Sequence, residues 1–475
     1  MGERVEVQTV ERGCRPFQYL REVENAGYPV LLESSLHNTD FGRYSILCWD
    51  PVKVLTCRGS SVEVENTQTG ASRKEDGAPF SVLSKEFLPH RIELPDSFHL
   101  PFAGGAVGYF SYDLRHQIES LPLSCEYDLA VPEFTLCFYD RALVFDHHRN
   151  VTEFVGPAGC DPPDFKLEDT ARDNAGAVAE TGRLPAIEGV VLESSFKPGE
   201  YPGAVQKVID YIAAGDIFQA NLSQRFEGFC PAEGIELYER LRMVNPAPFS
   251  AYMKYPDIEV VSSSPERFLL VEGDRVTTRP IKGTRARIAG DDVFNKRMEE
   301  ELLNSEKDHA ELAMIVDLER NDLGRVCSYG SVRVKEHAVL ETYPTVFHLV
   351  STVEGRLFRE QYDEFSLVRA TFPGGSITGA PKIRAMEIIE EIEPYARNIY
   401  TGSIGYFSFH GRADLNIVIR TLMKAGGRIY MHFGGGIVAD SDPQMEFQET
   451  LDKGKALFQA AGAENFEEIM GMAYP

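Results

Sequence analysis

A glutamate and a lysine lie close together in one unusual stretch of this sequence. Residues 261–290 read VSSSPERFLLVEGDRVTTRPIKGTRARIAG, with Glu266 between two β-prone runs and a GDRV turn after the second. A hairpin of this kind would bring Glu266 near Lys282. A carboxyl group beside an amine suits proton transfer. The arginines around them could capture a small polyanion, or could form a basic strand edge that discourages aggregation: Arg279, Arg285 and Arg287.

Two glycine-rich turns could also bind a substrate. In FPGGSITGAPKIRAMEII, glycines at 374, 375 and 379 free the backbone before a helix, whose first N–H groups can bind an anion. The loop lacks the GK[ST] ending of a nucleotide-binding loop, and its alternative role is a simple turn before a helix. The second turn, FGGGIVADS, holds Gly434–Gly436 and comes shortly before a helix that carries acidic residues.

Two pairs of acids have the spacing of neighbours on one helix face. They are Glu446 with Glu449 and Asp308 with Glu311. Carboxylates from two helices without a fixed lysine partner could hold Mg²⁺, which prefers oxygen ligands. The alternative is a pair of solvated acidic faces.

Three further polar residues stand in apolar surroundings. Arg420 interrupts the apolar run LNIVIRTL, and a substrate carboxylate could serve as its partner. Tyr400 could point its hydroxyl into the same space. His348 is either an active-site residue or a hydrogen-bonded histidine of the core.

The elements that must position these residues change in character along the chain. Residues 1–155 hold short β-prone runs, 156–195 are rich in Pro, Gly, Ala and Asp and predict a linker or surface excursion, and 196–465 alternate strands with helices. Helical spacing is predicted within residues 197–215, with Gly215 as the stop, and for 444–461, and LNIVIRTLMKAG is predicted to be a single strand. The pattern predicts an α+β fold in which two β-layers pack together with helices outside.

Composition excludes several classes of protein. The chain has 475 residues and 43% hydrophobic residues, which is typical of a soluble globular protein, and its formal net charge of -25 argues against a nucleic-acid surface. Its eight cysteines form no CxxC pair, and no run is long and apolar enough to span a membrane. The first residues lack the apolar core of a signal peptide, so we expect a cytoplasmic protein.

Six motifs taken together resemble the chorismate-utilising enzymes. These are SSSPERF, RPIKGTRAR, HAELAMIVDLERNDLGR, FPGGSITGAPKIRAMEIIEEIEP, YTGSIGYFS and FGGGIVADSDPQMEFQET, and they cover about residues 196–460 in the family's order. LLESS and PFAGGAVGYFSYD resemble the amino-terminal part of the amine-forming members. The resemblance implies the two-lobed β-sandwich flanked by helices of anthranilate synthase component I, with the chorismate site in the second half.

The family's functional residues map onto this sequence by motif. The resemblance implies that Glu266 is a general acid or base, that His348 is an active-site residue, and that Mg²⁺ is held by Glu311, Glu446 and Glu449. It implies a substrate-contacting set of Gln219, Thr284, Ser376, Tyr400, Arg420, Gly434, Gly435 and Gly436. It also implies a tryptophan pocket, regulatory or structural, that includes Leu32, Glu33 and Ser34.

Two positions divide the family by product. Members that add water carry a lysine where this chain has Gln219, and an amide cannot act as a base at neutral pH. PIKGT, with Lys282, is typical of members that form 4-amino-4-deoxychorismate, whereas anthranilate-forming members typically read PIAGT. The implied reaction is attack by Lys282 on chorismate C2 with loss of the C4 hydroxyl, followed by addition of ammonia at C4. The alternatives are formation of anthranilate and a non-catalytic homologue that binds chorismate or tryptophan.

The source of ammonia is expected to lie outside this sequence. No cysteine has the context of an amidotransferase nucleophile, so ammonia is expected from a separate glutamine amidotransferase subunit or from free ammonium.

Overall fold

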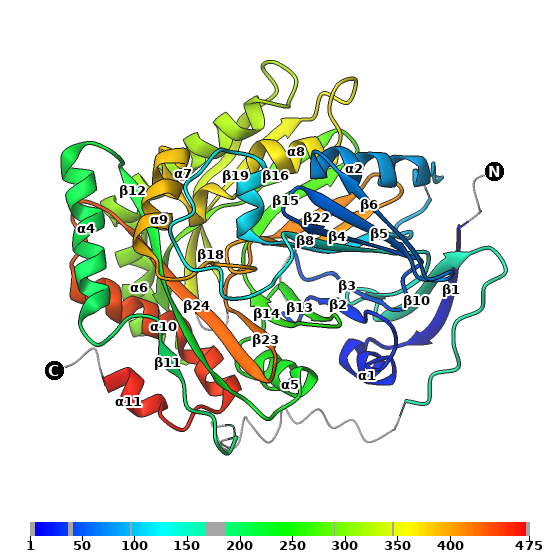
Figure 1. Cartoon of the computed structure of the whole chain (residues 1–475), viewed down its shortest axis with the longest axis horizontal. Coiled ribbons are helices and arrows are strands. Elements are labelled where there is room, and N and C mark those ends of the chain that lie inside the picture. Colours follow the sequence, from blue (N-terminus) through cyan, green and yellow to red (C-terminus); the bar gives the residue numbers. More distant parts are fainter. Residues whose placement is uncertain are drawn as a thin grey trace.

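The chain crosses repeatedly between two large sheets, so each sheet combines strands from both ends of the sequence (Figure 1). In the computed structural model the described residues are 5–36, 41–95, 97–167, 184, 187–288, 290–343 and 346–471.

The first sheet has twelve strands. In spatial order they are β1 (Val5–Arg12), β10 (Val151–Pro157), β9 (Ala142–Asp146), β3 (Tyr44–Cys48), β2 (Val30–Glu33), β13 (Phe249–Lys254), β14 (Glu259–Ser264), β23 (Thr421–Ala425), β24 (Arg428–Ile437), β12 (Gln219–Phe229) and β11 (Glu193–Ser194), with β20 (Gly379–Ala380) beside β12.

The second sheet also has twelve strands. Their order is β17 (Ile281–Ala286), β19 (Val346–Arg356), β16 (Arg275–Thr278), β15 (Arg267–Glu272), β22 (Ala413–Asn416), β21 (Ser403–Ser408), β7 (Gly105–Phe110), β8 (Phe134–Tyr139), β4 (Lys53–Arg58), β5 (Ser61–Asn66) and β6 (Ala71–Asp76), with β18 (Arg333–Thr342) beside β19.

Helices cover the outer faces of both sheets. The helical segments in chain order are α1 (Pro16–Glu22), α2 (Pro79–Phe87), η1 (Leu88–His90), η2 (Tyr112–Gln117), α4 (Glu200–Ala214), α5 (Gly234–Val244), α6 (Asp292–Leu303), α7 (Glu306–Gly324), α8 (Glu364–Thr371), η3 (Gly375–Ile377), α9 (Lys382–Ile392), α10 (Pro443–Ala461) and α11 (Phe466–Gly471). Their ends follow from the sequence: Ser305 and Asp442 cap α7 and α10 with side-chain oxygens, and Gly215 ends α4 in a left-handed conformation.

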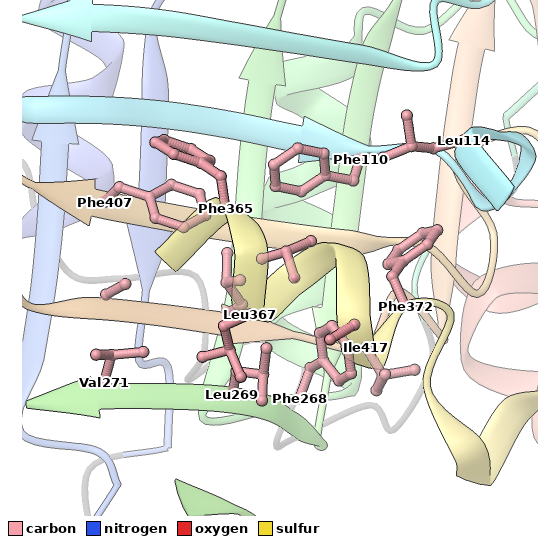
Figure 2. Close-up of a cluster of buried hydrophobic side chains, with 14 of the residues drawn as sticks. Phe110, Leu114, Phe268, Leu269, Val271, Phe365, Leu367, Phe372, Phe407 and Ile417 are labelled. Atoms are coloured by element: carbon pink, nitrogen blue, oxygen red, sulfur yellow. The ribbon is translucent and has the colours of Figure 1, made fainter. Parts of the chain in front are cut away.

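Apolar side chains fill three layers. Between the sheets, residues such as Met253 and Val260 of the first sheet pack with Val107 and Tyr109 of the second. Helices α1, α5 and α10 cover the first sheet, and α2, α7 and α8 cover the second. Figure 2 shows the latter layer, where Phe365 of α8 lies over strands of the second sheet. This arrangement confirms the predicted α+β fold of two packed β-layers with helices outside.

Both sheets continue across the predicted boundaries of the sequence segments. Strand β2 pairs with β13, and β7 pairs with β21, so residues 1–155 and 196–465 share each sheet. The middle of the predicted linker 156–195, at residues 168–183, 185 and 186, lies outside the described residues. At its end, Glu193 and Ser194 pair with β12.

One predicted strand is wrong. LNIVIRTLMKAG was expected to be continuous, but β22 ends at Asn416 in the second sheet and β23 begins at Thr421 in the first. The chain turns between them, where Arg420 has a φ of 50°. Hydrophobicity along the run is unchanged across the turn, because both strands are buried.

Candidate active site

The candidate site forms where the chain passes twice between the two sheets. One crossing runs from β14 through Glu266 to β15, and the other runs from β22 through residues 417–420 to β23. The crossings are hydrogen-bonded to each other: the Ile417 N–H donates to the Glu266 carbonyl at 3.0 Å, and the Ser263 N–H donates to the Arg420 carbonyl at 3.1 Å. The fold therefore places Glu266 and Arg420 on neighbouring turns.

Glu266 is a buried carboxyl group whose pKa lies near neutral pH. Its side chain accepts a hydrogen bond from the Ser376 hydroxyl at 2.7 Å. Burial raises the pKa of Glu266 to about 7, although Ser376 and the positive charge of Lys282 act in the opposite direction. Both protonation states are therefore populated at neutral pH, as a general acid or base requires.

Lys382 binds the backbone beside the glycine-rich loop that carries Ser376. Lys382 pairs with Asp322 of α7 at 2.5 Å and donates to the carbonyls of Thr371 and Pro373 at 2.9 and 2.8 Å. Its amine is engaged by the protein itself, so the loop differs from a phosphate-binding loop in chemistry as well as in sequence. Its effect is to place Ser376 against Glu266.

The predicted hairpin is confirmed in part. Strands β15 and β16 pair across the turn, but β19 lies between β16 and β17, so Lys282 approaches Glu266 from a strand beyond the hairpin. Glu266 and Lys282 nevertheless lie close enough for the lysine charge to lower the carboxyl pKa.

The Lys282 amine faces the glycine-rich end of β24. A β-carbon at Gly436 would lie 3.0 Å from Nζ of Lys282 and 2.3 Å from Nε2 of Gln219. The same amine lies 3.8 Å from Oε2 of Glu311, and 15% of the lysine side chain is exposed. Gln219 is 1% exposed, and its Oε1 has no hydrogen-bond partner among the described residues. The absence of a side chain at Gly436 therefore leaves an amine and an amide facing the same small space.

The arginines expected to capture a polyanion are paired with acids of the protein. Arg279 pairs with Glu341 at 2.5 Å, and Arg285 pairs with Glu301 at 2.8 Å and Asp308 at 3.1 Å. Arg287 donates to the carbonyl of Tyr343 at 3.5 Å. The predicted capture role of Arg279 and Arg285 is thus not supported, because neighbouring acids already neutralise their charges.

As the sequence indicated, the guanidinium group of Arg420 is buried with few polar partners. Its guanidinium group reaches the Asn245 amide oxygen at 3.5 Å and forms no ion pair with any described carboxylate. Burial lowers its pKa. Beside it, the Thr284 hydroxyl and Nδ1 of His348 are 2.9 Å apart, and burial together with Arg420 lowers the pKa of His348 to about 4. An uncompensated guanidinium beside a neutral histidine suits an anionic ligand.

Two of the three predicted metal carboxylates, Glu446 and Glu449, lie beside Gly435, and two of the three, Glu449 and Glu311, contact lysines. A β-carbon at Gly435 would lie 3.1 Å from Oε2 of Glu446 and 3.4 Å from Oε1 of Glu449. Glu449 pairs with Lys453 at 2.7 Å, which lowers its pKa, whereas burial raises the pKa of Glu446. Glu311 lies within 4.0 Å of Lys307 as well as near Lys282. The expectation that these acids lack lysine partners is therefore wrong for Glu449 and Glu311, whereas Glu446 accepts a hydrogen bond from the Ser441 hydroxyl at 2.6 Å.

The donor chemistry still fits a hard cation. In the described part of the chain, no three acidic, histidine or cysteine side chains are grouped closely enough to hold a metal ion. However, Glu446 and Glu449 converge on the open side of Gly435, and carboxylate oxygens are the ligands that Mg²⁺ prefers.

Two further predicted site residues, Tyr400 and Gly434, lie against or within strand β24. Tyr400 is buried and stacks on His432 of β24, with ring centroids 5.1 Å apart and a 15° angle between the planes. A β-carbon at Gly434 would lie 2.9 Å from Oδ1 of Asn221. Gly434 is part of β24 and Tyr400 packs against that strand, but no described contact joins Tyr400 to Lys282 or Glu266.

The residues predicted to bind tryptophan lie elsewhere, between the sheets. Leu32, Glu33 and Ser34 line a cavity of about 340 Å³ whose other walls include Phe249 and Tyr406. Tyr238 and Arg242 hold the Glu33 carboxylate at 2.6 and 2.7 Å, and the Ser34 hydroxyl has no partner among the described residues. The size and mixed lining suit a small amphipathic ligand.

Several residues of the site were missed by sequence reasoning. Lys307 and Lys453 contact the predicted metal carboxylates, and Lys453 could have been found because it lies four residues after Glu449. Glu319 is buried on α7, where it accepts a hydrogen bond from Thr278 at 3.1 Å. Burial and the nearby Glu266 raise its pKa well above the usual range. Nothing local in the sequence distinguishes Glu319 from an exposed helical glutamate.

Gly436→Ala is expected to lower kcat/KM by about 10- to 100-fold while the protein stays folded. The added β-carbon would overlap the ends of Gln219 and Lys282, which can move aside, and displacement of about 1 Å in a site can cost roughly 10²-fold. Gly203→Ala on α4 is the matched control, because a β-carbon there meets no atom within 4 Å. Steady-state kinetics and thermal unfolding of both variants check this, and unchanged kinetics for Gly436→Ala would contradict it.

Comparison with known proteins gives consistent results. The family model for chorismate binding enzyme matches residues 31–459. Aminodeoxychorismate synthase component 1 of Salmonella typhimurium is 42% identical over 438 residues, covering 92% of this chain and 93% of that protein. Anthranilate synthase component 1 of Thermus thermophilus is also 42% identical, over 93% of this chain and 94% of its own length.

A solved structure supports the fold assignment. The crystal structure of anthranilate synthase component I from Streptococcus pneumoniae superposes with a TM-score of 0.73 and 32% sequence identity, covering 88% of this chain and 92% of that one. This agrees with the predicted resemblance to anthranilate synthase component I. No helix in the described ranges combines the length and apolar character needed to cross a bilayer.

Proposed function

The chain belongs to the family of chorismate-binding enzymes, and from this premise we propose that it converts chorismate and ammonia to 4-amino-4-deoxychorismate. The observation that carries the proposal is the position of the Lys282 amine, which faces Gln219 and Gly436 within 3.8 Å of Glu311. Several relatives of 37–42% identity over most of the chain bear the name aminodeoxychorismate synthase component 1.

The proposed first step uses Lys282 as the nucleophile. The lone pair of Nζ attacks C2 of the chorismate ring, both ring double bonds shift, and the C4 hydroxyl departs with a proton from Glu266 as water, which leaves a secondary ammonium on Lys282. Ammonia then forms a bond to C4, both double bonds shift back, and the lysine leaves C2 as a primary amine. Glu266, now ionised, accepts the proton that ammonia loses. Because burial raises the pKa of Glu266 to about 7, its carboxyl group suits both proton transfers near neutral pH.

Other residues are proposed to bind and orient the ring. Arg420, which forms no ion pair with a described acid, would pair with a carboxylate of chorismate. Thr284 and His348 lie beside it, and Ser376 fixes the Glu266 carboxyl. Tyr400 and Gly434–Gly436 would form the wall under the substrate. Gln219, as an amide, would bind without activating water.

We propose that Glu311, Glu446 and Glu449 hold Mg²⁺. When bound, the ion would neutralise a carboxylate of chorismate and help to fix the ring. Removal of divalent ions with EDTA is expected to abolish turnover, and added MgCl₂ is expected to restore it. Full activity after exhaustive removal would contradict a magnesium requirement.

We propose two further partners for this chain, a source of ammonia and a tryptophan ligand. The "component 1" in the names of the relatives supports a separate second component, which we propose is a glutamine amidotransferase. The cavity beside Leu32, Glu33 and Ser34 is proposed to bind tryptophan. All eight cysteines are free thiols, which supports a proposed location in the reducing cytoplasm.

Identification of the product tests the proposed function. The purified chain is incubated with chorismate, MgCl₂ and ammonium chloride, and the products are separated and identified by mass spectrometry. We expect 4-amino-4-deoxychorismate. Anthranilate alone would assign the chain to the anthranilate-forming branch, and no turnover with bound chorismate would favour a non-catalytic homologue.

A further inference from the structure

A cavity lies among three helices on the outer face of the second sheet. Helices α2, α7 and α8 meet there, in the layer that covers this sheet (Figure 1). The cavity has a volume of about 320 Å³, which is at the lower end of the range for small-molecule sites. Its walls include the apolar Phe80, Ile118 and Val326 and the charged Arg325 and Arg369, and no acidic side chain is among the described residues that line it.

The two arginines of this cavity have no carboxylate partner in the described part of the chain. The guanidinium group of Arg369 forms neither a hydrogen bond nor an ion pair with a described residue. That of Arg325 forms no ion pair there, and one of its N–H groups donates to the Ala370 carbonyl at 3.0 Å. An arginine near the end of a helix can serve only to bind carbonyl oxygens. Arg325 does this with one of its five donors, and Arg369 does not, so most of their donors are left for a ligand.

Acids near the cavity are bonded to other groups. Asp363, which caps α8, accepts hydrogen bonds from the hydroxyls of Ser84 and Ser366 at 2.5 and 2.6 Å. Glu364 pairs with Arg359 at 2.7 Å and also with Arg91. Two acids of α7 are paired in the same way, Asp317 with Arg320 at 2.7 Å and Asp322 with Lys382 at 2.5 Å. The acids of the surrounding helices therefore have partners other than the two arginines of the cavity.

Hydroxyl donors and apolar walls complete the cavity. The hydroxyls of Ser81 and Tyr362 line it and make no hydrogen bond with a described residue. Guanidinium groups bind carboxylates through two parallel N–H bonds, and hydroxyl groups can donate to the same oxygens. Phe80, Ile118 and Val326 offer apolar surface beside these donors. The lining therefore suits a carboxylate that carries an apolar body better than it suits a bare inorganic anion.

The cavity is separate from the candidate active site, but it borders the segment that leads to that site. Ala370, whose carbonyl binds Arg325, is followed by Thr371, whose carbonyl binds Lys382. Six residues after Ala370, the Ser376 hydroxyl donates to Glu266. None of the predicted site residues lines the cavity.

We propose that the cavity among α2, α7 and α8, with Arg325 and Arg369 as its charged groups, is a second ligand site that binds a small carboxylate with an apolar or aromatic body. The carboxylate pairs with the two guanidinium groups, with Ser81 and Tyr362 as further donors. The apolar body lies against Phe80 and the other apolar walls. This site does not depend on which reaction the chain catalyses, so its failure and the failure of the proposed function are distinguishable.

Sodium benzoate, an aromatic carboxylate, is the probe for this site. Calorimetric titrations use Arg420→Gln protein without divalent ions, because this variant lacks the guanidinium group proposed to bind carboxylates in the active site. We expect saturable binding at one site. Adding Arg369→Gln should weaken this binding by about ten- to hundredfold, the usual effect of losing a charge-assisted hydrogen bond. The matched control adds Arg320→Gln, which removes the same charge from an exposed ion pair with Asp317 and should change the Kd by less than about twofold.

Three results would contradict the second ligand site. The first is the absence of saturable binding at benzoate concentrations up to about 50 mM, and the second is an unchanged Kd in the protein that carries Arg369→Gln. The third is equal affinity for inorganic phosphate, which would show that the apolar walls contribute nothing to binding. A wild-type crystal soaked in benzoate gives an independent measurement: a carboxylate on Arg325 and Arg369 supports the site, and an empty cavity overturns it.

Discussion

Lys282→Ala is expected to lower kcat for amination of chorismate by at least about 10³-fold, because the variant lacks the proposed nucleophile. Stability should change little, because the ion pair of the amine with Glu311 is long, at 3.8 Å, and Glu311 also lies within 4.0 Å of Lys307. Steady-state kinetics with ammonium chloride measures the loss, and chorismate binding measured by calorimetry shows whether the substrate site survives.

Lys307→Ala is the matched control for this experiment. It removes a positive charge within 4.0 Å of the same Glu311 carboxylate but leaves the amine that faces Gly436. We expect the control to keep kcat within a few-fold of the wild-type value, as most exposed ion pairs contribute little. Equal losses in both variants would show that Lys282 acts only through its charge, and wild-type turnover in Lys282→Ala would remove its covalent role.

Glu266→Gln is expected to lower kcat by about 10²- to 10⁴-fold, which is the usual range for loss of a general acid or base. The expected pH dependence has a definite direction. The acid form, which protonates the departing hydroxyl, predominates below the pKa of about 7, so kcat/KM should fall as the pH rises through about 7. This limb should be absent from the residual activity of Glu266→Gln.

Ser376→Ala tests whether the alkaline limb of the pH profile belongs to the Glu266 carboxyl group. The Ser376 hydroxyl favours ionised Glu266, so its removal should shift the alkaline limb to higher pH. A limb at the same pH in Ser376→Ala, or one that persists in Glu266→Gln, would assign the ionisation to another group. Glu319, which lies nearby with its pKa also raised by burial, would then be the first candidate.

Sequence motifs identified residues that lie together in the structure, but they did not predict how the fold brings these residues together. Glu266, Lys282, Ser376 and the glycines of 434–436 were identified by motif, and the structure brings them together. The predicted helices α4 and α10 are confirmed because a terminal glycine and a capping aspartate fix their ends.

The parts that failed depend on contacts between distant segments. The turn at Arg420 is hidden because both flanking strands are equally apolar. The arginines of 279–287 looked available for a polyanion, since their partners Glu341, Glu301 and Asp308 come from later elements. For the same reason the burial of Glu319 had no local signal.

The central claim is that the Lys282 amine forms a bond to the chorismate ring. Protein incubated with chorismate and MgCl₂ in the absence of ammonia is quenched in acid, and its intact mass and peptides are measured. We expect an increase equal to chorismate less one water, located on the peptide that contains Lys282 and absent from Lys282→Ala. An unmodified Lys282 under conditions in which added ammonium gives turnover would contradict the claim.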